Sequence, residues 1–213
     1  MTAYIEVLTE GASDVPVVEE LLTRHLGLRK NEHFRIHPHQ GRGRLPDNCL
    51  AMPDPKRRGL LDQLPAKLRG MGAALPESAL VLVLIDVDDD DCHGMLAALQ
   101  AMLMQLPRRP ARVLFRLAIE ETESWFLADP EAVRQGFPHA KLRKIQGIAP
   151  DAVVGAWERL ADALGVNVRT VTGTDKLAWA RSIAPHLNFE NPASPSLRKL
   201  VQGTQQYLDT VTP

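Results

Sequence analysis

The chain has 213 residues and only two cysteines, Cys49 and Cys92, neither of which belongs to a CxxC pair. The sequence therefore offers no disulfide framework and no structural zinc site. No apolar run approaches the length of a membrane helix, and the segment MTAYIEVLTEG lacks the charged and apolar regions of a signal peptide. We expect a cytoplasmic protein without a membrane partner.

An excess of positive charge is also missing, because the formal net charge is −1. This argues against a protein that binds nucleic acid mainly through its overall charge, although a local basic strip is compatible with the total. Hydrophobic residues make up 45% and charged residues 24% of the chain, as in ordinary globular proteins. The length suits either one α/β domain with a substantial core or an α/β core with a small helical addition.

The most informative stretch is the apolar run 79–85, which ends in Asp86 and, after Val87, in four further aspartates at 88–91. Such a run predicts a strand buried on both faces, as in a parallel sheet. The aspartates repel one another unless water or a cation neutralises them. An acidic loop that only keeps the strand end soluble is one interpretation, and a site for a hard divalent cation is the other.

Position favours the cation site. Ligands of open α/β sheets bind beyond the carboxyl ends of the strands, and Asp86 and Asp88, two residues apart on one strand, point to the same side. We expect the aspartates at 89–91 to form the turn and to begin the next helix.

The elements predicted around this strand alternate between strand and helix. Strands are expected at 4–9, 34–39, 79–87 and 112–119, and a short one at 167–171. The first helix is expected to begin at Ser13 as its cap, with Pro16 in the first turn. Further helices are expected at 60–71, 95–106, 121–128, 152–164, 176–187 and 196–208. The pattern predicts an open, mostly parallel, Rossmann-like α/β sheet. We place the core at 1–130 and a mainly helical region at 131–213.

Two more acidic segments follow predicted strands, namely Glu10 after the first strand and the run Glu120-Glu121-Thr122-Glu123 after the strand at 112–119. If the strands are parallel, these acids lie at the same edge as Asp86. The loop Gln40-Gly41-Arg42-Gly43-Arg44 carries two arginines and two glycines. It is either a phosphate-binding loop or a solvated surface loop, and the sequence leaves both open.

The order of these motifs resembles the TOPRIM fold of topoisomerases, bacterial primases and OLD-type nucleases. There a glutamate-glycine turn follows the first strand, as in Glu10-Gly11, and a later strand ends in Asp-x-Asp, as in Asp86-Val87-Asp88. Asp14 is similar to an extra acid of the nuclease branches. The segment from Glu121 to Asp129 is similar to the Glu-x-Glu-x-Trp-x-x-x-Asp segment of a family of TOPRIM-like bacterial proteins, and 191–198 is similar to that family's carboxyl-terminal signature.

The resemblance implies a nuclease that uses Mg²⁺ or Mn²⁺ to cut phosphodiester bonds. It implies Glu10, Asp86 and Asp88 as metal ligands and catalytic residues, with Glu121 or Glu123 joining them. Arg42, Arg44 or Lys176 would neutralise the transferred phosphate. Only Tyr4 and Tyr207 are available as tyrosines and neither follows an acidic strand end, which speaks against a covalent topoisomerase-like link.

The resemblance also suggests partners. Members of the family are often encoded beside AAA or ABC-type ATPases, an arrangement reminiscent of phage-defence systems, and nucleic acid, DNA before RNA, is the expected substrate. The alternative is a non-catalytic TOPRIM-like module that binds metal or nucleotide and regulates an ATPase. A third possibility is an acidic-loop α/β protein with a small-molecule site.

Overall fold

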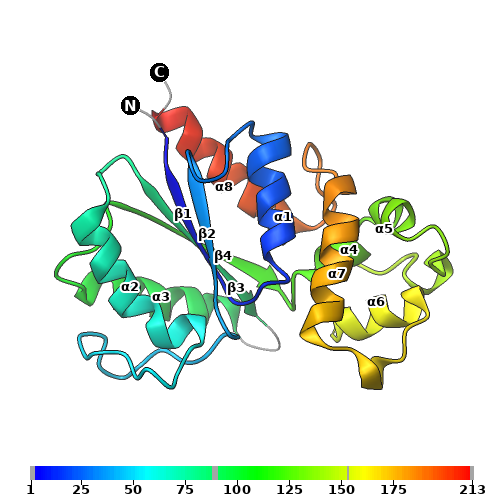
Figure 1. Ribbon diagram of the computed structural model, residues 1–213, viewed down its shortest axis with the longest axis horizontal. Helices are drawn as coiled ribbons and strands as arrows, with labels where there is room; N and C mark the ends of the chain where they lie inside the picture. Colours follow the sequence, from blue (N-terminus) through cyan, green and yellow to red (C-terminus); the bar gives the residue numbers. More distant parts are fainter. Residues whose placement is uncertain (1–2, 88–90, 153, 212–213) are drawn as a thin grey trace.

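A computed structural model describes residues 3–87, 91–152 and 154–211. Within these residues the fold is built on one parallel sheet. Its four strands are β1 (Ile5–Thr9), β2 (Phe34–Pro38), β3 (Leu80–Val87) and β4 (Arg112–Ile119), in the order β2-β1-β3-β4. All three pairings are parallel, and helices flank the sheet (Figure 1). The predicted open α/β fold, consistent with a Rossmann-like or TOPRIM-like arrangement, is confirmed.

Both faces of the sheet are covered. Helices α2 (Leu60–Ala74) and α3 (Cys92–Gln105) lie on one face, and α1 (Val15–Glu20) and α8 (Pro195–Val211) lie on the other (Figure 1). Side chains of β3 alternate between the two, since Val81 and Val83 pack in the core on the α2 and α3 side and Leu82 and Leu84 in the core on the α1 and α8 side. The continuous apolar run reflects this double burial.

The remaining helices gather beyond the carboxyl end of the sheet (Figure 1). They are α4 (Glu123–Leu127), α5 (Pro130–Gly136), α6 (Ala156–Leu164) and α7 (Gly173–Ile183). The shorter turns are the π-helical η1 (Leu21–His25), which continues α1 along the sheet, and the 3-10 turns η2 (Leu142–Lys144), η3 (Val168–Thr170) and η4 (Ala184–His186). One hydrophobic cluster runs from the sheet through these helices. The division at residue 130 stays a prediction.

Two local predictions were wrong, and one helix was missed. Residues 167–171 form the turn η3 rather than a strand, because the Asn167 side chain accepts the N–H of Arg169 and turns the backbone. The first helix is capped at Asp14 rather than at Ser13, and the Asp14 side chain makes no cap hydrogen bond. Helix α5 was not predicted, although Asp129 accepts the N–H of Ala132 and Pro130 opens the first turn, which is a recognisable start signal.

The last helix is fixed to the first strand. The hydroxyl of Tyr207 accepts the N–H of Tyr4 at 3.1 Å and lies 3.0 Å and 2.9 Å from the carbonyl oxygens of Tyr4 and Ser78.

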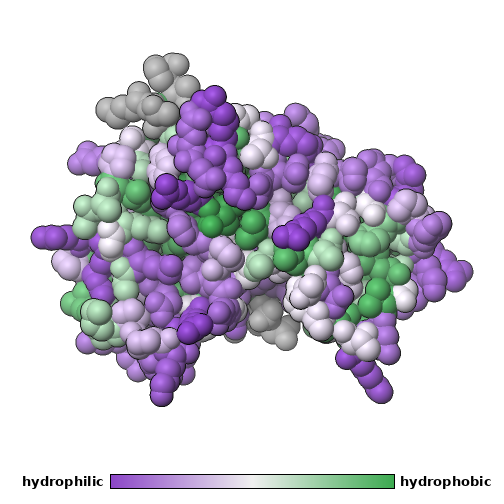
Figure 2. Space-filling model, in the orientation of Figure 1, coloured by the Kyte–Doolittle hydropathy of each residue, from purple (hydrophilic) through white to green (hydrophobic). Residues whose placement is uncertain are grey.

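In the described part of the chain, no helix combines the length and apolarity needed to cross a membrane. The face shown in Figure 2 is mostly polar, with apolar side chains gathered near its middle.

Candidate functional site

The carboxyl ends of β1 and β3 bring two predicted site residues together. Glu10 follows β1, and its Oε1 accepts the backbone N–H of Asp86 at 3.0 Å. Both strands are parallel and adjacent, which is why residues 76 positions apart meet. Asp88, the second acid of the Asp-x-Asp pair, lies outside the described residues, as do residues 89 and 90. Asp91 caps α3 by accepting the N–H of His93, as predicted for this turn.

Asp86 carries an unsatisfied oxygen. Its Oδ1 is buried and has no hydrogen-bond partner among the described residues. Burial raises the pKa of Asp86 well above its ordinary value, and repulsion from Asp14, Glu10 and Glu123 raises it further. A buried polar atom without a partner is costly, so this oxygen is suited to a ligand that brings positive charge.

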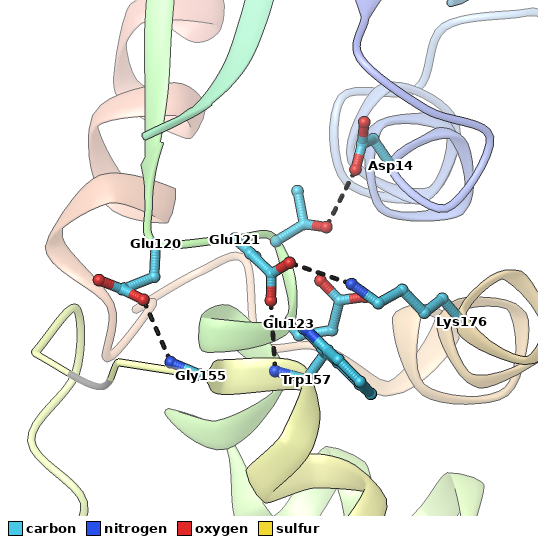
Figure 3. A network of polar contacts seen from close by, with 8 residues as sticks. Asp14, Glu120, Glu121, Glu123, Gly155, Trp157 and Lys176 are labelled. Carbon is cyan, nitrogen blue, oxygen red and sulfur yellow. Dashed lines mark hydrogen bonds and ion pairs between the residues drawn. The ribbon is translucent and has the colours of Figure 1, made fainter. Parts of the chain in front are cut away.

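Asp14 adds a third carboxylate from the start of α1. It accepts the N–H of Gly11 at 2.9 Å. It also accepts the hydroxyl of Thr122 at 3.0 Å, the contact that Figure 3 marks with a dashed line. Burial raises the pKa of Asp14 to about 6, although the two hydrogen bonds and the charge of Lys176 act in the opposite direction. Thr122 therefore links the end of β4 to α1 across the cluster.

Glu121 and Glu123 face a lysine that comes from α7 (Figure 3). The Nζ of Lys176 lies 3.0 Å from Oε1 of Glu121 and 3.7 Å from Oε1 of Glu123. Burial raises the pKa of Glu123 to about 7, even though the lysine lowers it. Burial alone would lower the pKa of Lys176, but attraction to Glu123 and Glu121 outweighs it and the pKa is raised.

Helix α6 completes this side of the cluster. The ring of Trp157 lies under Lys176, with Nζ 4.9 Å from the ring centroid, which is within the range of a cation-π contact. The backbone N–H of Trp157 donates to Oε2 of Glu121 at 3.3 Å. Sequence reasoning did not identify Trp157, because nothing in residues 156–164 indicates which helix they will face.

Glu120 points the other way. Its backbone is left-handed, with φ of 67°, and its side chain accepts the N–H of Gly155 at 3.3 Å on the side away from Lys176 (Figure 3). The turn at Glu120 thus separates it from Glu121 and Glu123, which share the lysine.

The loop with Arg42 and Arg44 lies beside the same edge. The N–H of Gly41 donates to the carbonyl of Glu10 at 2.9 Å, and both arginines line a cavity of about 410 Å³ that also includes Asp91. Their predicted role in phosphate binding stays a prediction.

The cluster is not a ready coordination shell. Among the described residues, no three histidine, cysteine, aspartate or glutamate side chains are placed to hold one metal ion. Glu10, Asp14 and Glu121 instead accept hydrogen bonds from the protein. The donor set is nevertheless one of hard carboxylate oxygens, which fits Mg²⁺ or Mn²⁺, and the free oxygen of Asp86 is where such an ion would be needed.

Comparison with solved structures shows a shared fold. Two structures of the C-terminal region of the OLD protein of Xanthomonas campestris pv. campestris, phased with platinum and with mercury, are each 12% identical to this chain. The platinum-phased match covers 98% of this chain and 94% of that chain, with a TM-score of 0.50. The mercury-phased match covers 98% of this chain and 96% of that chain, with a TM-score of 0.49. At this identity the likeness concerns the fold.

Comparison by sequence gives the family. No curated protein matched the chain. Residues 9–204 match the model of a family described as a domain of unknown function, DUF4276. The matched segment begins at the last residue of β1 and ends within α8, so it includes every described residue of the acidic cluster. The chain therefore belongs to the DUF4276 family.

Proposed function

We propose that the protein is a nuclease-like phosphodiesterase that uses Mg²⁺ or Mn²⁺ to act on nucleic acid. The observation that carries the proposal is the buried, unpartnered Oδ1 of Asp86, in a side chain that is repelled by the carboxylates of Asp14, Glu10, Glu123 and Glu121. A divalent cation would satisfy this oxygen and relieve the repulsion that raises the pKa of Asp86.

The residues proposed to hold the ion are Glu10, Asp14, Asp86 and Glu123, with Asp88 as a further candidate outside the described residues. The four described side chains are not gathered around one point, so they would have to turn toward the ion to bind it. Three of them come from different segments, after β1, at the end of β3 and at the start of α4. When bound, such an ion polarises a phosphodiester and lowers the pKa of a water molecule. Glu121 would position Lys176 through their ion pair, and the ammonium group of Lys176 would neutralise charge on the phosphate.

Two further observations support a nuclease over other uses of a carboxylate cluster. The sequence resembles the TOPRIM fold of OLD-type nucleases in the order of its acidic strand ends. The chain also shares its fold with the C-terminal region of an OLD protein, at a TM-score of 0.50. The proposed role as the effector of an ATPase-linked phage-defence system rests on the resemblance alone.

The test is a cleavage assay with plasmid, single-stranded DNA and RNA in Mn²⁺ or Mg²⁺. We expect Asp86→Asn to reduce cleavage by roughly 100-fold or more, because it removes a charge that the transition state needs. The matched control is Asp209→Asn, an exposed aspartate on α8, which should cut like the wild type. Undiminished metal-dependent cleavage by Asp86→Asn would sink the proposal.

A non-catalytic partner of an AAA or ABC-type ATPase is the second candidate. The net charge of −1 favours it, because phosphate contacts normally dominate nucleic-acid affinity. This candidate predicts no cleavage by either form of the protein, together with co-purification of an ATPase.

A further inference from the structure

A mostly apolar pocket of about 300 Å³ lies along the outer edge of β4, between α3 and α8. Its lining combines the apolar side chains of Phe115, Leu117 and Ile119 with the exposed basic residues His93 and Lys199. Pockets of this size and character bind small or planar groups. Neither the proposed chemistry nor the ion cluster uses it.

The edge of β4 offers hydrogen-bonding groups to this pocket. Ile119 is in register with Val87, and the N–H of Glu120 donates to the carbonyl of Val87 at 2.9 Å. In a parallel ladder, alternate residues bond to the same neighbour, so the backbone groups of 116, 118 and 120 face β3. Those of 115, 117 and 119 face outward, where the described residues add no further strand to the sheet.

Two of the three outward carbonyls are already occupied. The carbonyl of Phe115 accepts from Nη1 of Arg116, and that of Ile119 accepts from Oγ of Ser124, both at 2.9 Å. Within the described ranges, the N–H and C=O of Leu117 have no protein partner on this side. The pocket therefore presents one backbone donor and one backbone acceptor between apolar walls.

This pattern disfavours a peptide strand as the occupant. Strand addition needs a row of free N–H and C=O groups along the edge, and here side chains cap the carbonyls on both sides of Leu117, which is a way of protecting an edge. A single planar group with apolar faces and a donor-acceptor edge fits the remaining pair. A nucleobase has these properties.

The pocket is also close to the acidic cluster. Ala118, next to Leu117, is in register with Asp86 on the adjacent strand, and neighbouring strands lie about 4.8 Å apart. A nucleotide chain whose phosphate reaches the carboxyl edge can thus place a neighbouring base at β4. The guanidinium of Arg116 is held by the carbonyl oxygens of Lys199 and Phe115, so the exposed Lys199 is the cation at the pocket that suits the phosphates flanking that base.

We propose that the pocket at the outer edge of β4 binds one unpaired base of a single-stranded nucleic acid, against Phe115 and Leu117. The inference rests on the proposed function, since it names the substrate class of the same site. It makes the protein selective for unpaired or frayed strands over intact duplex, because a paired base cannot enter the pocket.

The test compares binding of a labelled single-stranded oligonucleotide with that of an oligonucleotide of equal length in which every base is missing, in Ca²⁺. We expect the wild type to bind the base-bearing strand at least about fivefold more tightly, the range of stacking on a protein side chain. Cys92→Trp, which fills the pocket from α3, should lose this preference. Ala97→Trp, which adds the same ring at an exposed position of α3 outside the pocket, should keep it.

A second measurement needs no variant. Cys92 lines the pocket, whereas Cys49 is buried elsewhere, so the base-bearing strand should slow alkylation of the Cys92 thiol and the strand without bases should not. Equal binding of both strands by the wild type, or protection by a short alternating Glu-Val peptide instead, would overturn the inference. Base-dependent binding without metal-dependent cleavage would support base binding in the pocket and refute the proposed nuclease activity. Metal-dependent cleavage without base-dependent binding would support the nuclease activity and refute base binding in the pocket.

Discussion

At the scale of single residues, Lys176 holds the carboxylates of Glu121 and Glu123 in place. Its ammonium group lies against Glu121 and Glu123 and over Trp157, and 23% of its side chain is exposed. Removing one partner from a buried ion pair costs more than losing a surface pair, because the other charge stays in a medium of low polarity.

We therefore predict that Lys176→Met lowers the free energy of unfolding by about 1–3 kcal/mol at pH 8 in the absence of metal. The loss should be smaller at pH 5, where Glu123, with its pKa of about 7, is protonated. Lys144→Met is the control, because Lys144 pairs with the well-exposed Asp162, and it should cost less than about 1 kcal/mol. Denaturant unfolding at both pH values measures the difference, and equal losses in the two variants would contradict it.

The residue scale also shows where sequence reasoning ends. The order of Glu10, Asp86 and the acids after β4 was visible, because each follows an apolar run that predicts a strand. The sequence did not show which of the three glutamates face Lys176, since this depends on the left-handed backbone at Glu120. The lysine itself lies 55 positions from Glu121, and no local pattern predicts that contact.

At the scale of elements, α2 depends on a close approach to the loop that precedes β4. A Cβ on Gly72 would lie 2.5 Å from the carbonyl carbon of Arg109 and 2.7 Å from the carbonyl oxygen of Arg108. Backbone atoms cannot move aside as a flexible side chain can. A Cβ on Gly70, two residues earlier in the same helix, would meet nothing within 4 Å.

The two glycines give a matched pair of variants. Gly72→Ala is expected to destabilise the protein by about 1–3 kcal/mol through overpacking. Gly70→Ala should stabilise it by about 0.5–1 kcal/mol, because alanine favours a helix more than glycine does. Thermal unfolding of both variants measures the change in stability, which should have opposite signs in the two. A stabilised Gly72→Ala variant would show that the loop at Arg108 and Arg109 moves aside easily.

Elements were predictable where periodicity was strong and local. The four strands of the sheet and the helices on its faces were found from apolar patterning, with shifts of a few residues at their ends. The turn η3 was missed because residues 167–171 carry β-branched side chains but find no neighbouring strand, so the local hydrogen bond of Asn167 decides the backbone.

For the whole molecule, the cluster makes stability depend on pH. Glu123 and Asp14 have pKa values of about 7 and about 6 in the folded protein, above the ordinary values of carboxyl groups. The folded state therefore binds more protons than the unfolded state between about pH 4 and pH 7. The stability this contributes is present below about pH 4 and is lost as pH rises through the folded pKa values.

We predict that the metal-free protein loses stability across this range, with Glu123 accounting for up to about 3 kcal/mol. Glu123→Gln resembles the protonated form and should flatten the dependence in part, leaving the shares of Asp14 and of Asp86, whose pKa values burial also raises. Unfolding free energies at intervals between pH 4 and pH 8 measure both slopes. A variant whose slope equals that of the wild type would show that Glu123 does not titrate in this window.

The hydroxyl of Tyr207 against Tyr4 joins positions 203 residues apart. During synthesis on the ribosome, β1 emerges long before α8, so the apolar side of the sheet that α8 covers stays open until translation reaches the last helix. Contacts this distant slow folding, because a long segment must be ordered before they form. The nascent chain is thus expected to depend on chaperones for most of its synthesis, and to become resistant to proteases only when the final turns of α8 leave the exit tunnel.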